Sequence, residues 1–282
     1  MTIQKKVFDF ILFTSFYIAA CSVLMLYQTY TLFIQKPIDF HYLAFVFFST
    51  VSSYNLHWML TPHSVNPSFR VNWSIRHKGY HLILFVTGLL LSIYFFTFFI
   101  HYWFWIGISA GLTFLYTAPK IPVSPFPLLK KLAFGKTFFL AFVWTYVTVI
   151  LPMFIENTSW SEKSILFCLE QFFFIFSISI LFDYRDRADD IADGIRSMIV
   201  YLNEKSINIL FAISILLSAS LLVLLLREGL SLTNFLFLLT PLLILSILYR
   251  HAKKNFSDYL YCFVLDGLLM LSGLMLWIMS WF

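Results

Sequence analysis

Residues 172–197 read FFFIFSISILFDYRDRADDIADGIRS, so that an apolar run ends directly in a dense cluster of charges. Four aspartates follow one another at spacings of three, four and three residues: Asp183, Asp186, Asp190 and Asp193. On a continuous helix these spacings place the carboxylates within an arc of roughly 80°, where neighbouring acids repel one another. We therefore expect a positive partner, either a hard divalent cation such as Mg²⁺ or the interleaved Arg185, Arg187 and Arg196. The alternative is a solvated charged loop without a ligand.

The composition is that of an integral membrane protein. Hydrophobic residues make up 60% and charged residues 12% of the 282 residues, whereas soluble domains hold about 25% charged residues. A helix needs about 20 apolar residues to cross a bilayer. About nine runs reach or approach this length: 7–34, 41–60, 80–100, 103–118, 132–154, 164–182, 207–226, 231–249 and 256–281. We predict an all-α fold in which residues 1–282 form a single polytopic membrane domain of about nine transmembrane helices.

The positions of Lys and Arg predict how the chain is oriented, because cytoplasmic loops of membrane proteins are rich in these residues. With the N-terminus in the cytoplasm, only Lys36, Lys163 and Arg227 face outside, which leaves 16 of the 19 (19 − 3) inside. An odd number of crossings then places the C-terminus outside. We expect a multi-pass protein of the bacterial inner membrane. The net charge of +5 follows from this orientation, and no nucleic-acid-binding motif is present.

Three long polar connections, 61–79, 119–131 and 183–206, lie on the predicted inside, and functional residues concentrate in such loops. Four prolines in the second connection exclude a helix and predict an extended strap that carries Lys120, Lys130 and Lys131. These lysines have two interpretations: they fix the topology and contact lipid headgroups, or they bind an anion. Carboxylates for Mg²⁺ and cations for phosphate oxygens together suit a diphosphate.

The acidic stretch resembles the second aspartate-rich motif of the UbiA superfamily of intramembrane prenyltransferases, D-x-R-D-x-x-x-D followed by G-I-x-T, with Ser197 in the place of Thr. Tyr116 with Pro119 and the Lys130–Lys131 pair is similar to the family's Y-x-x-P and Lys region. The resemblance spans nearly the whole chain. It implies a bundle of nine helices with a central cavity that opens to the cytoplasmic side.

Carried over by position, the resemblance implies roles for particular residues. The catalytic and metal-binding residues would be Asp183, Asp186 and Asp190, with Mg²⁺ as the cofactor. The residues that contact the diphosphate would be Asn55, Lys130, Lys131, Arg185, Arg196 and Tyr116. The partners would be a prenyl diphosphate, a lipophilic acceptor and the lipid bilayer.

The first motif of the family, N-D-x-x-D-x-x-x-D, departs strongly in this chain, where only Asn55 remains. Leu56, Met59 and His63 occupy the acidic positions. Leu and Met cannot bind Mg²⁺, and His is a poor ligand for it. One metal site is therefore missing or reduced to Asn55. Nearby cations offer a replacement for the metal's charge: Arg70, Arg76, His77 and Lys78.

The resemblance implies a UbiA-like prenyltransferase, an alkyl or aryl transferase that moves an isoprenoid group from its diphosphate to an aromatic or lipophilic acceptor. The degenerate first motif favours an alternative, a non-catalytic membrane protein of the same fold that binds a lipid or isoprenoid. A transporter would show paired Gly or Pro breaks, which are not evident. A CDP-alcohol phosphotransferase motif begins to fit at Asp190 and then fails after Gly194.

Asp266 lies deep in the last apolar run, where a charge costs about 3 kcal/mol and indicates a function or a buried partner. It would orient an acceptor or act as a base. The alternative is a structural carboxyl that is protonated or hydrogen-bonded to a neighbouring helix.

Overall fold

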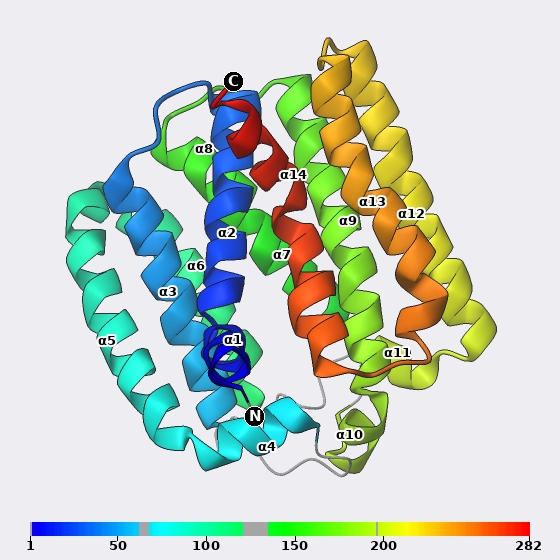
Figure 1. Ribbon diagram of the computed structural model, residues 1–282. Helices are drawn as coiled ribbons and strands as arrows, with labels where there is room; N and C mark the ends of the chain where they lie inside the picture. The colour runs from blue at the N-terminus through cyan, green and yellow to red at the C-terminus, as the bar shows by residue number, and fades with distance from the viewer. Residues whose placement is uncertain (1, 62–67, 121–134, 196) are drawn as a thin grey trace.

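The computed structural model describes residues 2–61, 68–120, 135–195 and 197–282. Within these ranges the chain forms helices joined by short turns and no strand, which confirms the all-α prediction. The long helices lie side by side, and the two termini lie at opposite ends of the bundle (Figure 1). The lower end in this view carries the short helices α4 (Phe69–Arg76), α10 (Arg187–Ala192) and α11 (Met198–Tyr201). We call it the acidic end.

The other α-helices, in chain order, are α1 (Ile3–Phe13), α2 (Phe16–Thr29), α3 (Phe40–Met59), α5 (Lys78–Phe96), α6 (Trp103–Thr117), α7 (Lys136–Thr145), α8 (Leu151–Ile155), α9 (Glu162–Arg185), α12 (Glu204–Arg227), α13 (Leu232–Ala252) and α14 (Asp266–Met279). Short 3₁₀ helices are η2 (Thr97–Tyr102) and η3 (Ala118–Lys120). Three π-helical turns extend or precede long helices: η1 (Tyr30–Ile34), η5 (Tyr146–Ile150) and η6 (Leu260–Leu265).

Seven helical stretches in the described part of the chain are long and apolar enough to cross a membrane. One of them, Lys78–Thr117, has 40 residues. At 1.5 Å per residue it would measure about 60 Å, roughly twice the thickness of the hydrocarbon layer. It is divided at Phe99, whose backbone is not helical, and α6 turns back beside α3. α3 itself is long enough to span but more polar than these seven, because it carries Ser, Thr, Asn and His residues.

The N-terminal run differs from the predicted span 7–34, because it is two helices rather than one. α1 ends at Phe13, and Ser15 has a positive φ of 69° before α2 begins at Phe16. α1 is held at the acidic end through Asp9, which is fully buried and accepts a 2.7 Å hydrogen bond from the Tyr259 hydroxyl. The apolar stretch long enough to span therefore starts at Phe16.

The first spanning helix and the last one lie against each other, α2 beside α14 (Figure 1). Gly273 makes this approach possible, since a Cβ atom there would lie 2.1 Å from the Leu24 carbonyl oxygen of α2. The Tyr17 hydroxyl donates a 2.8 Å hydrogen bond to the Phe263 carbonyl at the same interface. In membranes, small residues allow helices to pack closely in this way.

We expect Gly273→Ala to lower the free energy of unfolding by about 1–3 kcal/mol, because the added methyl group forces two backbones apart. Thermal unfolding of the purified protein in detergent measures the effect. Gly107→Ala in α6 is the matched control, since a Cβ there meets nothing within 4 Å. Equal unfolding temperatures for the two variants would show that α2 and α14 are not this close.

Candidate active site at the acidic end of the bundle

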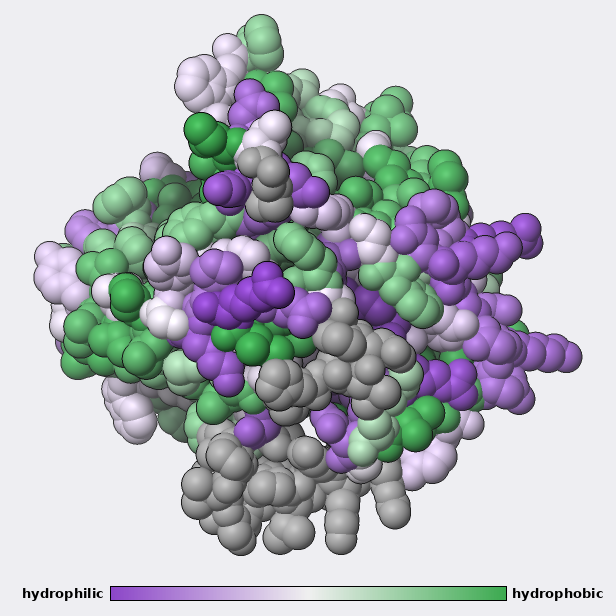
Figure 2. Space-filling model, turned by 60° about the horizontal axis from the view of Figure 1, so that its bottom comes forward, coloured by the Kyte–Doolittle hydropathy of each residue, from purple (hydrophilic) through white to green (hydrophobic). Residues whose placement is uncertain are grey.

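A cavity of about 900 Å³ opens toward the acidic end and continues between the helices of the bundle. Figure 2 looks at this end and shows hydrophilic residues gathered there beside hydrophobic surface. The charged residues among the lining are the acids Asp183, Asp186, Asp189, Asp190, Asp193, Asp258 and Asp266 and the cations Arg70, Lys120, Lys136 and Arg185. The sequence motif and the cavity therefore coincide.

The acidic stretch does not form the single helix on which the 80° arc was based. α9 ends at Arg185, Asp186 has φ −82° and ψ 0°, and α10 begins at Arg187. The break turns the carboxylates of Asp183 and Asp190 toward one another, and both side chains are buried. The geometric part of that prediction is thus wrong. Of the expected positive partners, Arg185 pairs with Asp186, whereas Arg187 pairs with Glu204.

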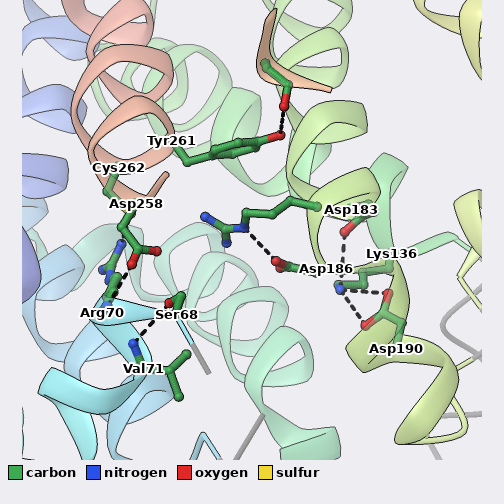
Figure 3. A network of polar contacts seen from close by, with 12 residues as sticks. Ser68, Arg70, Val71, Lys136, Asp183, Asp186, Asp190, Asp258, Tyr261 and Cys262 are labelled. Atoms are coloured by element: carbon green, nitrogen blue, oxygen red, sulfur yellow. Dashed lines mark hydrogen bonds and ion pairs between the residues drawn. The ribbon is translucent and has the colours of Figure 1, made fainter. Parts of the chain in front are cut away.

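Lys136, the first residue of α7, lies between these two carboxylates (Figure 3). Its Nζ is 3.2 Å from Asp183 Oδ1 and 3.1 Å from Asp190 Oδ1. The Thr137 hydroxyl donates a further hydrogen bond to Asp183 Oδ2. Burial raises the pKa of Asp190 to about 6, although Lys136 opposes the shift. Sequence reasoning counted Lys136 only as a topology charge and missed this contact.

Asp186 is paired with its neighbour Arg185, whose Nε donates a 2.8 Å hydrogen bond to Oδ1. Burial alone would raise the pKa of Asp186, but Arg185 and Lys136 outweigh it and hold the pKa below its usual value. The guanidinium also lies 4.7 Å from the centre of the Tyr261 ring. Its buried Nη1 has no hydrogen-bond partner among the described residues, so it remains available to a ligand.

Arg70 brings a second guanidinium to the cavity from α4. Its backbone N–H donates to Asp258 Oδ2 at 2.8 Å, and its Nη1 donates to Cys262 Sγ at 2.8 Å (Figure 3). The guanidinium lies 4.0 Å from the centre of the Trp58 ring, which fits a cation–π contact. Its buried Nε has no partner in the described part of the chain. Of the four cations suggested after the first motif, Arg70 lines the cavity, whereas Arg76, His77 and Lys78 are absent from its lining.

Lys120 supplies a third cation and is anchored by α3. Its Nζ lies 2.7 Å from His57 Nε2 and 2.7 Å from Thr61 Oγ1. Burial lowers the pKa of Lys120 to about 7, and Lys136 adds to this shift. Tyr116 lines the cavity as expected of a residue near the headgroup, and its ring stacks on His57. The sequence analysis placed Lys120 on the strap with Lys130 and Lys131 and left open whether these lysines fix the topology or bind an anion.

Asn55 does not line the cavity, so the prediction that it contacts the diphosphate is corrected. It is fully buried, and its Nδ2 donates to the Thr14 carbonyl at 2.8 Å and to the Val51 carbonyl at 2.7 Å. Its Oδ1 is 2.7 Å from His81 Nδ1. Asn55 therefore joins α1, α3 and α5 and has no free group for a ligand.

Three expected diphosphate contacts, Lys130, Lys131 and Arg196, lie outside the described residues. The same is true of His63 in the degenerate first motif.

The donor set at the acidic end fits Mg²⁺ by chemistry. No three acids, histidines or cysteines of the described ranges converge on one point, but Mg²⁺ usually takes only one or two carboxylates together with substrate phosphates. Among the charged lining residues that the structure describes, acids outnumber cations by seven to four, which leaves negative charge for a divalent cation to offset. Asp183, Asp186 and Asp190 supply hard oxygen ligands.

We expect Lys136→Gln to lower the free energy of unfolding by about 3 kcal/mol at pH 8, because two buried carboxylates lose their cation. The loss should shrink at pH 5. Because the pKa of Asp190 in the folded protein lies above its unfolded value, protonation below about pH 6 favours the folded state. Thermal unfolding at both pH values measures this, with Lys163→Gln at the opposite end of α9 as the control. A loss independent of pH would contradict the assigned contact.

No curated protein and no solved structure matches the chain. A family model described as the UbiA prenyltransferase family matches residues 76–280, which include the acidic stretch, Lys120, Lys136 and Asp266. The match covers well over half of the 282 residues. The chain belongs to the UbiA prenyltransferase family.

Proposed function

We propose that the protein transfers an isoprenoid group from a prenyl diphosphate to an aromatic or other lipophilic acceptor. One observation carries this proposal: a single cavity joins a charged mouth at the acidic end to an interior lined by apolar side chains. Lining residues of the interior include Val143, Trp144, Val147, Ile175 and Leu269. Such a cavity suits a molecule with a charged head and a long hydrocarbon tail.

The diphosphate would bind at the mouth. Arg70 and Arg185 both have a buried N–H group without a partner among the described residues. Leaving such a group unpaired is costly, and a phosphate oxygen is a strong acceptor for it. Lys120 adds a third positive charge, and Tyr116 lies beside it through their shared contact with His57. Lys130, Lys131 and Arg196 remain sequence-based candidates for the same role.

Asp183, Asp186 and Asp190 would hold Mg²⁺ at the mouth. When bound, Mg²⁺ stabilises the negative charge that develops on a diphosphate leaving group. Lys136 keeps Asp183 and Asp190 oriented toward the cavity, and Arg185 does the same for Asp186. These cations also add to the electrostatic stabilisation of the leaving group.

The isoprenoid chain would lie in the apolar interior. Phe138, Phe139 and Trp144 line the cavity, and aromatic rings stabilise the positive charge that forms on an allylic carbon. The same side chains exclude water, which would otherwise capture that carbon. With the orientation predicted from Lys and Arg, this site would face the cytoplasm.

A second candidate function is that of a non-catalytic relative that binds a lipid or isoprenoid. The observation that favours it is the side of the cavity formed by α3 and the residues directly after it, which presents Tyr54, His57, Trp58 and Thr61 rather than acids. The described carboxylates of the mouth belong to the acidic stretch and to the segment around Asp258. Metal binding would thus depend on one side of the mouth.

We expect Mg²⁺ with farnesyl diphosphate to raise the thermal unfolding temperature of the purified protein, and Asp186→Asn or Asp190→Asn to abolish the Mg²⁺-dependent part. Both substitutions remove a negative oxygen ligand and keep the side-chain size. Glu162→Gln is the control, because Glu162 lies at the opposite end of α9. Full protection of both aspartate variants would remove the proposed metal site.

The test of catalysis is release of inorganic pyrophosphate from farnesyl or geranylgeranyl diphosphate in the presence of Mg²⁺ and lipophilic acceptors. We expect release from the wild type and a fall of at least about 100-fold in kcat for Asp190→Asn, the effect typical of losing one electrostatic stabiliser. If the diphosphates protect the protein but no acceptor supports release, the non-catalytic function is the correct one.

A further inference from the structure

Asp266 is a charged residue of the cavity to which the proposed function assigns no role. It opens α14 directly after the π-helical turn η6, and it lines the same cavity as the mouth residues. It follows Asp258 by eight residues, most of them in η6, so it lies deeper in the bundle than the mouth. An ionisable residue at such depth marks a functional site by default.

The Asp266 carboxylate is available to a ligand. The charges that act on it are those of Arg70 and Arg185, and no hydrogen bond to it is formed within the described residues. Glu170 shows the contrasting arrangement of a structural acid. Its two oxygens accept 2.8 Å hydrogen bonds from Ser218 and Gln171, and it is absent from the cavity lining.

The side chains near Asp266 present hydrogen-bond acceptors to the cavity. Asp266 lies near Tyr54 of α3 and Cys21 of α2. Ser22 and Thr50 line the cavity; their hydroxyls lie 2.8 Å from the carbonyls of Ala19 and Val46 and 3.2 Å from each other. A hydroxyl oxygen has two lone pairs, so this pair can still accept a hydrogen bond from a ligand.

The same region disfavours an acidic ligand. The described cations of the lining are Arg70, Lys120, Lys136 and Arg185, and each of them is paired or anchored at the mouth. A carboxylate that entered the interior would meet the charge of Asp266, and the two guanidinium groups near enough to act on that charge, Arg70 and Arg185, would already be engaged by the diphosphate. Burying a charge unpaired is strongly unfavourable.

We propose that Asp266 is the general base for the acceptor, and that the acceptor is an uncharged lipophile with a reactive hydroxyl group, such as a phenol or an alcohol. This inference rests on the proposed prenyl transfer. The C1–O bond of the prenyl diphosphate breaks, and its electron pair leaves with the diphosphate. The acceptor oxygen forms the new bond to C1, and its proton passes to the Asp266 carboxylate. The products are a prenyl ether, pyrophosphate and protonated Asp266, which then loses its proton to solvent.

The experiment uses the purified full chain with farnesyl diphosphate, Mg²⁺ and two acceptors that differ in one group, a 4-alkylphenol and the 4-alkylbenzoic acid of equal chain length. Mass spectrometry identifies the product, and pyrophosphate release gives kcat. We expect the phenol to yield the ether and the benzoic acid to yield at least tenfold less product. Asp266→Asn should lower kcat with the phenol by about 100-fold, as expected for loss of a general base.

Two measurements separate this inference from the proposed function. Farnesyl diphosphate should protect Asp266→Asn from thermal unfolding as well as it protects the wild type, because the headgroup site is intact. Glu170→Gln, the control for loss of a buried membrane acid, should keep the wild-type kcat. An unchanged kcat in Asp266→Asn, or a preference for the benzoic acid, overturns the inference while leaving prenyl transfer in place. Failure of farnesyl diphosphate to protect the wild type overturns both.

Discussion

The acidic end depends on one ammonium group, Lys136 Nζ, which lies within 3.2 Å of both Asp183 and Asp190. Each buried carboxylate would cost several kcal/mol without a partner. The contact ties the start of α7 to the end of α9 and to α10, so it fixes three elements with one charge. Because this cation offsets part of the charge of two acids, the mouth remains open to a further positive ion.

The cavity combines a charged mouth with an apolar interior, a combination that is rare in the binding sites of soluble proteins. At the mouth, cations from α4, α7, α9 and η3 surround carboxylates in a partly dry setting, where electrostatic interactions are stronger than in water. The interior is apolar and carries isolated polar groups, of which Asp266 is the charged one among the described lining residues. This division matches a substrate that has a charged head and a hydrocarbon tail, and the acceptor would have to enter the interior.

The sequence predicted the all-α membrane fold and the acidic stretch because both are local patterns, namely apolar length and charge spacing. The contacts that complete the site are not local. Lys136 meets an acid 47 residues away (183 − 136), and no spacing rule connects them. Asn55 shows the opposite error: it matches the family's first motif and was predicted to bind the ligand, but it holds α1, α3 and α5 together instead. Ser15, with its positive φ, likewise interrupts the stretch 7–34, which its hydropathy predicted to be one continuous helix.

The close packing of α2 on α14 at Gly273 has a consequence for biosynthesis. The ribosome releases the segments of a membrane protein in chain order. α2 therefore cannot pack on α14 until α14 has been synthesised. The wall of the cavity that carries Asp266 is thus the final piece to be added. Before that segment is inserted, the cavity is not enclosed. The polar side chains of α2 and α3 must then be covered by lipid or by the insertion machinery.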